Sequence, residues 1–352
     1  MQEWIGNPYP TGWLQVPAFL LLLVPMNLLT GGAIIAAVMA TMKGNVESRR
    51  LVAWLTRTFP AAMIWSAIAG ALALHVLGSL AMPQGRFQSV PRPTLGHEAA
   101  DGTWPILTII SGLVIAGSLH RFTLTRGGAS RAKVGMWAFT LSLSTVSALC
   151  VAGLNVDEQD FLGARPEFGP SLAPRFFHTL LAAVAVAGML VALHGLLQRR
   201  RDERYSRWVV ERGMRWFVVP TALQMVVGFY LLLALPGAVR SRFLGGSPVA
   251  TAEIIAGILL AIAAFSVVTH ATNAADPRRP LIAGAVLLAG TLIVMALLRE
   301  QVRYAYLEKA YARLPECRPS AGEVAIPLAL MGATGIGMAA WLLRRLDAAP
   351  PT

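Results

Sequence analysis

The chain has 352 residues, of which 55% are hydrophobic and only 14% are charged, and its mean hydropathy is +0.58. These values exclude an ordinary soluble domain, in which about a quarter of the residues are charged. The net charge of +12 does not indicate nucleic-acid binding, because the basic residues lie in short loops between long apolar runs. The composition predicts a polytopic membrane protein that is surrounded by lipid and has no nucleic-acid partner.

Nine apolar runs are long enough to cross the hydrocarbon core, which requires about 20 residues in a helix. None alternates as a strand does, and only helices or closed barrels satisfy the backbone in lipid, so we expect an all-α bundle. We divide it into a first four-helix unit (1–154), an outer loop (155–173) and a second unit of five helices (174–352). The expected spans are residues 14–42, 52–82, 103–120, 134–154, 174–198, 215–235, 250–270, 280–298 and 324–346.

The loops predict the orientation of the bundle. About two thirds of the 30 Lys and Arg residues lie on one side, in segments 43–57, 121–133, 199–215, 278–279 and 344–345. Cytoplasmic loops are enriched in Lys and Arg, so we expect the N-terminus outside and the C-terminus inside, in a bacterial inner membrane. Of the long outer segments, 299–323 is expected either to join two helices or to continue the eighth span as a surface helix.

Five histidines lie within the spans or at their ends, and the orientation sorts them into two layers. His75 and His178 belong to the outer layer, whereas His194, His270 and His120 lie toward the cytoplasm. An imidazole inside a bilayer is costly and usually has a partner, and haem iron is one such partner. His75 with His178 would hold an outer haem, and His194 with either His270 or His120 would hold an inner one.

Each histidine also has a structural interpretation, as a hydrogen-bonded core residue or as an anchor at a helix end. Met295 is the main alternative to His75 as a haem ligand. His178 and His194 are 16 positions apart, which corresponds to about 24 Å of rise and about 160° of rotation, so they point to different faces of a straight helix. Arg175 lies one turn before His178, at the rim where haem propionates would emerge.

The remaining reactive residues form no known catalytic motif. Glu253 is the only acid inside a predicted span, and it is either a proton acceptor for quinol or an interfacial residue. Cys150 and Cys317 fall on the same outer side, and spacing alone leaves open whether they form a disulfide. His97 is expected in a solvated loop. The chain contains no Cys-x-x-Cys-His, Walker A or His-Glu-x-x-His sequence.

The fifth and sixth spans resemble subunit I of the cytochrome bd quinol oxidases. The similarity lies in Arg175-Phe-Phe-His-Thr-Leu-Leu-Ala-Ala-Val-Ala-Val-Ala-Gly-Met, followed by a basic loop and a span that starts near Trp216. This resemblance implies that His178 binds a low-spin b haem. The family's first-helix histidine and its Gly-Arg-Gln-Pro motif are missing. The pattern is therefore closer to bd-like b-type membrane subunits that pass quinol electrons to periplasmic multihaem c-type cytochromes.

These observations predict a subunit of a quinol dehydrogenase or quinol:cytochrome c oxidoreductase. We expect it to hold one or two b-type haems, to work with other membrane subunits, and to pass electrons from quinol to a periplasmic c-type cytochrome. The alternative is a haem-free transporter, or an assembly or anchor subunit. In that case the histidines, above all His178, His75, His194 and His270, bind metal or protons.

Overall fold

The computed structural model describes residues 14–41, 45–80, 171–311 and 321–349, and within these ranges it contains helices and no strands. Seven of these helices are long and apolar enough to cross a membrane, so the chain is a multi-pass membrane protein. They are α2 (Gln15–Thr41), α3 (Val46–Leu80), α6 (Leu172–Leu197), α7 (Glu203–Ala234), α9 (Pro248–Ala271), α10 (Arg278–Tyr311) and α11 (Ala321–Asp347).

Each of these seven helices corresponds to one predicted span. The two other predicted spans, 103–120 and 134–154, lie outside the described residues. So do the loop residue His97, the predicted inner ligand His120 and both cysteines, Cys150 and Cys317. The division into two units, the number of nine spans and the orientation in the membrane therefore stay predictions.

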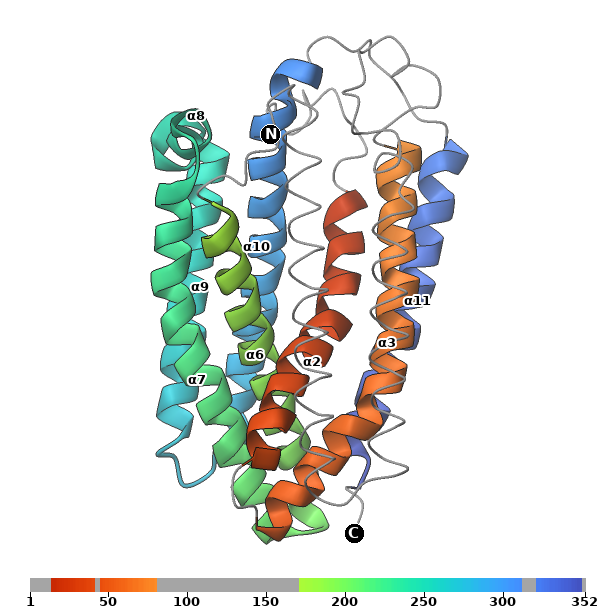
Figure 1. Ribbon diagram of the computed structural model, residues 1–352, viewed down its shortest axis with the longest axis vertical. Coiled ribbons are helices and arrows are strands. Elements are labelled where there is room, and N and C mark those ends of the chain that lie inside the picture. Colours follow the sequence, from red (N-terminus) through yellow and green to blue (C-terminus); the bar gives the residue numbers. More distant parts are fainter. Residues whose placement is uncertain (1–13, 42–44, 81–170, 312–320, 350–352) are drawn as a thin grey trace.

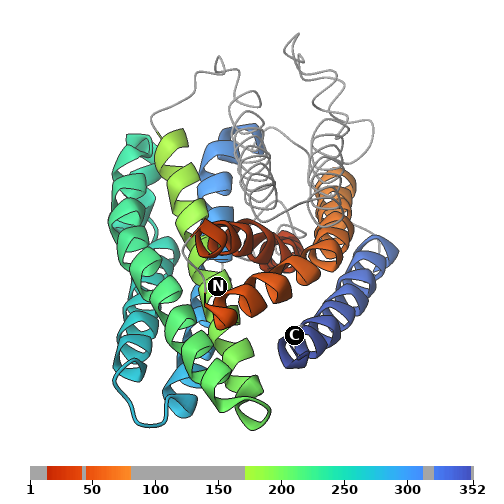
Figure 2. The ribbon, with the colours of Figure 1, turned by 60° about the horizontal axis from the view of Figure 1, so that its bottom comes forward.

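The seven helices form an upright bundle in which successive described helices run in opposite directions (Figure 1). α6 packs along α7, α9 packs along α10, and α2 packs against both α3 and α6. Figure 2 shows α2 lying between α3 and the α6–α7 pair. A short helix, α8 (Gly237–Ser241), and a π-helical turn, Arg242–Gly246, join α7 to α9.

Glycines allow the central helices to approach each other closely. A Cβ atom on Gly31 of α2 would lie 2.0 Å from the carbonyl oxygen of Ala183 in α6. A Cβ atom on Gly213 of α7 would lie 2.4 Å from the backbone nitrogen of Ala192, also in α6. Small residues at such crossings let backbones pack together where lipid provides no hydrophobic driving force between helices. α6 is thus held in the middle of the bundle.

α7 begins well before the predicted start of its span at residue 215. Asp202 caps it by accepting a hydrogen bond of 2.9 Å from the backbone N–H of Tyr205. Within its first turns, Arg207 pairs with Glu203 at 3.0 Å. A capped N-terminus and ion pairs between residues four apart both stabilise a helix in water. Hydropathy alone therefore placed the start too late, because these turns project beyond the apolar segment.

α10 continues without a break from its apolar segment to Tyr311. The structure thus agrees with the second of the two expectations for segment 299–323, a helix that extends the eighth span, as far as residue 311. Residues 312–320 lie outside the described residues.

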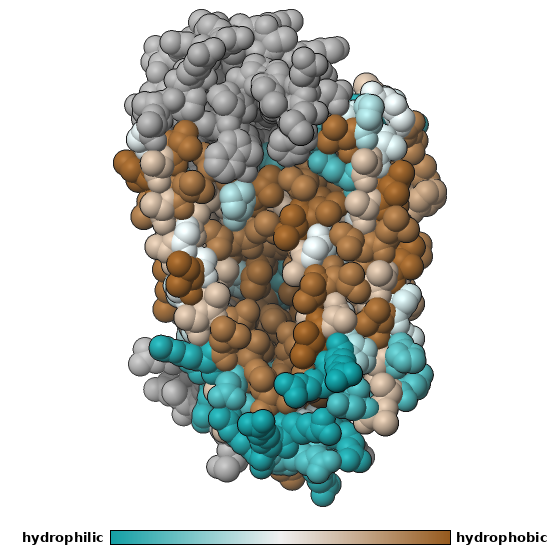
Figure 3. Space-filling model, turned by 180° about the vertical axis from the view of Figure 1, so that it is seen from behind, coloured by the Kyte–Doolittle hydropathy of each residue, from teal (hydrophilic) through white to brown (hydrophobic). Residues whose placement is uncertain are grey.

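The surface of the bundle separates into an apolar belt and a polar end. Figure 3 shows hydrophobic side chains along the length of the helices and hydrophilic ones gathered at the end where the C-terminus lies in Figure 1. The exposed apolar residues of the belt include Val226, Phe229, Ile255, Leu259, Val286 and Ile336. A belt of this kind is the surface that lipid covers.

Candidate functional site

His178 lies near the N-terminal end of α6 and faces α7. Its Nε2 atom is 3.3 Å from the side-chain amide nitrogen, Nε2, of Gln224. Its Nδ1 atom is buried and has no hydrogen-bond partner among the described residues. A Cβ atom on Gly228 would lie 3.1 Å from the imidazole, so a glycine in α7 makes room for the ring. We call His178, Gln224 and Gly228 the His178 site.

A buried polar atom without a partner requires an explanation, because leaving it unpaired costs about 1–3 kcal/mol. Histidines that bind metals commonly use one ring nitrogen for the metal, while a neighbouring polar group holds the other. At the His178 site the amide nitrogen of Gln224 faces Nε2, whereas Nδ1 has no polar partner among the described residues and lies against Gly228 of α7. His178 thus keeps one buried nitrogen that no described polar group satisfies.

Among the described side chains, the structure shows no pairing of His178 with a second predicted ligand of the outer layer. His75 belongs to α3, which α2 separates from α6 (Figure 2), and the His75 side chain lies outside the described residues. Met295 packs between α9 and α10, close to Gly257. Arg175 is half-buried and lies one turn before His178.

His194, near the other end of α6, is fully buried and has protein partners on both ring nitrogens. Its Nδ1–H donates to the carbonyl oxygen of Leu346 at 2.7 Å. The hydroxyl of Tyr205 lies 3.4 Å from Nε2. The indole of Trp54 stacks on the ring, with 4.0 Å between the centroids and 13° between the planes. In this arrangement neither nitrogen of His194 is available to an iron.

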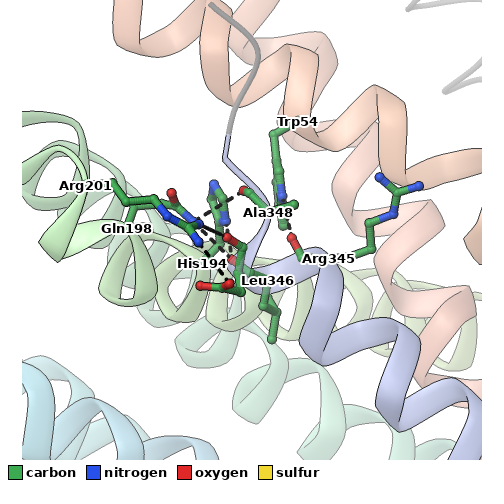
Figure 4. A network of polar contacts seen from close by, with 8 residues as sticks. Trp54, His194, Gln198, Arg201, Arg345, Leu346 and Ala348 are labelled. Atoms are coloured by element: carbon green, nitrogen blue, oxygen red, sulfur yellow. Dashed lines mark hydrogen bonds and ion pairs between the residues drawn. The ribbon is translucent and has the colours of Figure 1, made fainter.

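Side chains around His194 hold the end of α11, as Figure 4 shows. Trp54 Nε1 donates to the carbonyl of Arg345 at 2.9 Å, and Gln198 donates to that of Asp347 at 3.1 Å. Arg201 contacts both the carbonyl and the carboxylate of Asp347. The last carbonyls of a helix have no partner within the helix, and these donors supply one. We call the donors Trp54, His194, Gln198 and Arg201 the C-terminal clamp.

An ion pair ties the clamp to the start of α7. The guanidinium of Arg50 donates to Asp202 at 2.7 Å and lies 4.4 Å above the ring of Tyr205. The backbone N–H of Tyr205 and the charge on Arg50 together hold the pKa of the Asp202 carboxyl below its usual range. Arg50 therefore contacts both Asp202, which caps α7, and Tyr205, whose hydroxyl lies beside His194.

The remaining candidates lie apart from these two groups. His270 is exposed at the C-terminal end of α9. The Glu253 side chain in α9 is hydrogen-bonded to Gln301 in α10. Within the described parts of the chain, no three His, Cys, Asp or Glu side chains gather in a group that could hold a metal ion. Among the predicted histidine ligands whose side chains the structure describes, His178 alone has a buried nitrogen without a polar partner.

Sequence reasoning missed the partners of both α6 histidines. Gln224 and Gly228 are one turn apart on α7, and a glutamine within an apolar run is the signal that could have identified Gln224. No such signal existed for His194, because Leu346 lies 152 positions later in the chain.

No protein-family model and no curated protein matches the chain. In fold, the chain resembles a solved structure described as bd oxidase from Geobacillus thermodenitrificans, with a TM-score of 0.72. The match covers 96% of this chain and 98% of the other, at 12% sequence identity. The similarity therefore extends over the whole bundle, well beyond the fifth and sixth spans that carry the resemblance in sequence.

Proposed function

We propose that the chain is a membrane subunit of a respiratory complex of the bd-oxidase type, in which His178 binds a b-type haem that is reduced by quinol. The unpaired, buried nitrogen of His178 is the observation that carries this proposal. The fold shared with a bd oxidase chain supports the class of complex, and the Phe-His-Thr sequence around His178 supports the ligand.

Two observations at the His178 site bear on such a group. Nδ1 of the imidazole has no polar partner among the described residues, and the ring packs so closely on α7 that a Cβ on Gly228 would lie 3.1 Å from it. We expect Arg175, one turn nearer the end of the helix, to pair with a propionate. When bound, the haem would supply one-electron chemistry between quinol and the next carrier.

The surroundings of His194 and His270, the two other histidines whose side chains the structure describes, do not support a second haem. Both nitrogens of His194 face protein partners, and His270 is exposed at a helix end. The electron acceptor, a periplasmic c-type cytochrome, the bacterial inner membrane and the neighbouring membrane subunits stay predictions from the sequence.

The test is a dithionite-reduced minus oxidised absorption spectrum of purified protein, with a pyridine haemochrome assay for haem type and amount. We expect a b-type spectrum that His178→Ala abolishes and that His270→Ala leaves unchanged. The second variant is the matched control, because it removes an imidazole that lies exposed at a helix end.

Unchanged haem content in folded His178→Ala protein would disprove the ligand. A featureless spectrum of the parent protein, expressed with haem supplied, would disprove the haem itself and favour the haem-free alternative of a transporter, assembly or anchor subunit.

A further inference from the structure

The polar end of the bundle carries more arginine charge than its described acids neutralise. Arg57 of α3 and Arg344 of α11 are exposed there, and neither forms an ion pair with a described acid. The six described acids of this end are each paired with another arginine, in Glu47–Arg204, Asp202–Arg50, Glu203–Arg207, Glu211–Arg215, Asp276–Arg199 and Asp347–Arg201. The guanidinium groups of Arg57 and Arg344 are therefore available to an anion from outside the chain.

Arg57 and Arg344 lie beside a contact between α3 and α11. Trp54 Nε1 donates to the carbonyl oxygen of Arg345 at 2.9 Å, and Figure 4 shows these two residues next to each other. Arg57 follows Trp54 by three positions on α3, and Arg344 directly precedes Arg345 on α11. The fold thus brings two arginines from distant parts of the chain to one place.

Helical periodicity places both arginines on the same side of this pair of helices. Trp54 and Trp65 both contact α11, Trp65 where a Cβ atom on Gly337 would lie 2.7 Å from its ring. At 100° per residue, Arg57 is rotated by about 60° from Trp54, and Arg344 by about 20° from Gly337. Because α3 and α11 run in opposite directions (Figure 1), these rotations turn the two side chains to one side.

An exposed apolar surface adjoins the two arginines. Ile64 is seven positions after Arg57, on the same face of α3, and it is exposed. Ile336 and Leu343, also exposed, are seven positions apart and share a face of α11 next to Arg344. A cationic side chain at the end of an apolar strip matches a lipid, whose headgroup is polar and whose chains are not.

We propose that Arg57 and Arg344 bind the headgroup phosphate of an anionic phospholipid, in the leaflet that adjoins the polar end. Its acyl chains lie along the exposed faces of α3 and α11. Guanidinium groups bind phosphate oxygens through paired, charge-assisted hydrogen bonds, and basic sites between membrane helices bind anionic headgroups. The carbonyls at the end of α11 repel an anion less than bare ones do, because the C-terminal clamp already donates to them.

The bound lipid connects α3 to α11 beside the C-terminal clamp. A ligand that binds only the folded protein stabilises it in proportion to its concentration over its dissociation constant. The site involves no haem, so it is independent of the proposed function. It predicts that an anionic phospholipid raises the unfolding temperature of the protein, whereas a zwitterionic one does not.

The experiment measures the binding of phosphatidylglycerol and of phosphatidylcholine to the purified protein in detergent, by native mass spectrometry and by thermal unfolding. We expect the parent protein to bind phosphatidylglycerol more tightly. The variant Arg57→Gln/Arg344→Gln should weaken that binding about 30-fold, because each arginine near an anionic surface contributes about a factor of five. It should leave the binding of phosphatidylcholine unchanged.

The matched control is Arg207→Gln/Arg215→Gln, which removes the same charge from the same end of the bundle. Both arginines are exposed, and each is paired with a glutamate four residues earlier on α7. We expect this control to bind phosphatidylglycerol as the parent does. Both double variants should unfold at the parent's temperature in phosphatidylcholine, because all four side chains lie on the surface.

Three results would overturn the lipid site. Equal binding of the two lipids by the parent protein would show that it does not select an anionic headgroup. An equal loss of phosphatidylglycerol in both double variants would show that net charge alone attracts the lipid. If inorganic phosphate raised the unfolding temperature as much as phosphatidylglycerol does, Arg57 and Arg344 would bind a free anion and not a lipid.

Discussion

The two ends of α6 carry the same residue type in very different surroundings. His178 has one protein partner, Gln224, and one buried nitrogen without a partner. His194 is fully enclosed, with partners on both nitrogens and an indole stacked on its ring. In the sequence both are single histidines in one apolar run, so the neighbouring helices alone make the difference.

This comparison suggests a way to rank histidines in membrane helices. An ionisable residue in a span is a functional candidate by default, because burying it is costly. The cost is met within the protein when both nitrogens find partners, as at His194, and the residue is then structural. A residue such as His178, with one nitrogen satisfied and one buried and unpaired, is the better candidate for a ligand.

The largest expected effect is on stability, at the end of α6 where both nitrogens of His194 have partners. His194→Ala removes a buried ring that stacks on Trp54, and it leaves the Leu346 carbonyl with only the longer contact from Gln198, at 3.4 Å. We expect the free energy of unfolding to fall by about 3 kcal/mol, with the haem content per folded molecule unchanged. Thermal unfolding in detergent measures the first quantity and the pyridine haemochrome assay the second. If His194→Ala were as stable as the exposed control His270→Ala, the structural role assigned to His194 would be wrong.

The next effect concerns the other end of α6. In Gly228→Val even the added Cβ would lie 3.1 Å from the His178 ring, and the two methyl groups add further atoms. We therefore expect the free energy of unfolding to fall by about 1–3 kcal/mol through overpacking. A glycine with no atom near its Cβ position, Gly332 of α11, provides the control substitution Gly332→Val.

The strain should depend on the imidazole. In a His178→Ala background, Gly228→Val should destabilise the protein much less than in the parent, because the two residues are in contact. Equal costs in both backgrounds, measured by thermal unfolding, would show that another neighbour resists the valine.

A smaller effect is expected for a single member of the C-terminal clamp. Gln198→Leu removes a donor to the backbone carbonyls at the end of α11 but keeps the stack of Trp54 on His194. We expect a loss of about 1 kcal/mol in the free energy of unfolding, again measured in detergent. A loss as large as that of His194→Ala would mean that the donors act only as a unit.

The smallest effect is on pH dependence. The pKa of Asp202 is lowered by the Tyr205 N–H and by Arg50, so its ionised form stabilises the fold at any pH above the unfolded-state pKa, about 4. This contribution is lost as the pH falls from there through the lower folded-state pKa. Because the pair is partly exposed to solvent, we expect only about 0.5 kcal/mol.

Unfolding measured between pH 3 and pH 6 should show this acid-side loss in the parent protein and a reduced slope in Asp202→Asn. A parallel pH dependence of the two proteins would contradict the assignment to Asp202.

The length of each apolar run predicted the existence and the position of the seven described helices, because the thickness of the bilayer constrains both. The helix ends were predicted less well. α7 extends to Glu203 because charged pairs and the cap at Asp202 stabilise turns that hydropathy cannot detect. The cap at Asp202 and the pair of Glu203 with Arg207 are local in the sequence, so capping signals could have predicted this end.

The candidate site could be predicted only in part. Phe-His-Thr in an apolar run pointed to His178, and the structure places this ring beside Gln224 and Gly228. The same reasoning predicted that His194 is a ligand, although residues of other helices lie beside both of its ring nitrogens. Such partners follow from how helices pack and are not visible in the spacing of residues along one helix.

The C-terminal clamp has a consequence for the order in which the protein is made. Trp54, His194 and Gln198 are synthesised and inserted long before the α11 carbonyls that they bind. Until α11 emerges, these polar groups face an incomplete bundle, and a chain interrupted before that point displays them inside the membrane. The clamp is therefore complete only in a chain that extends to the end of α11.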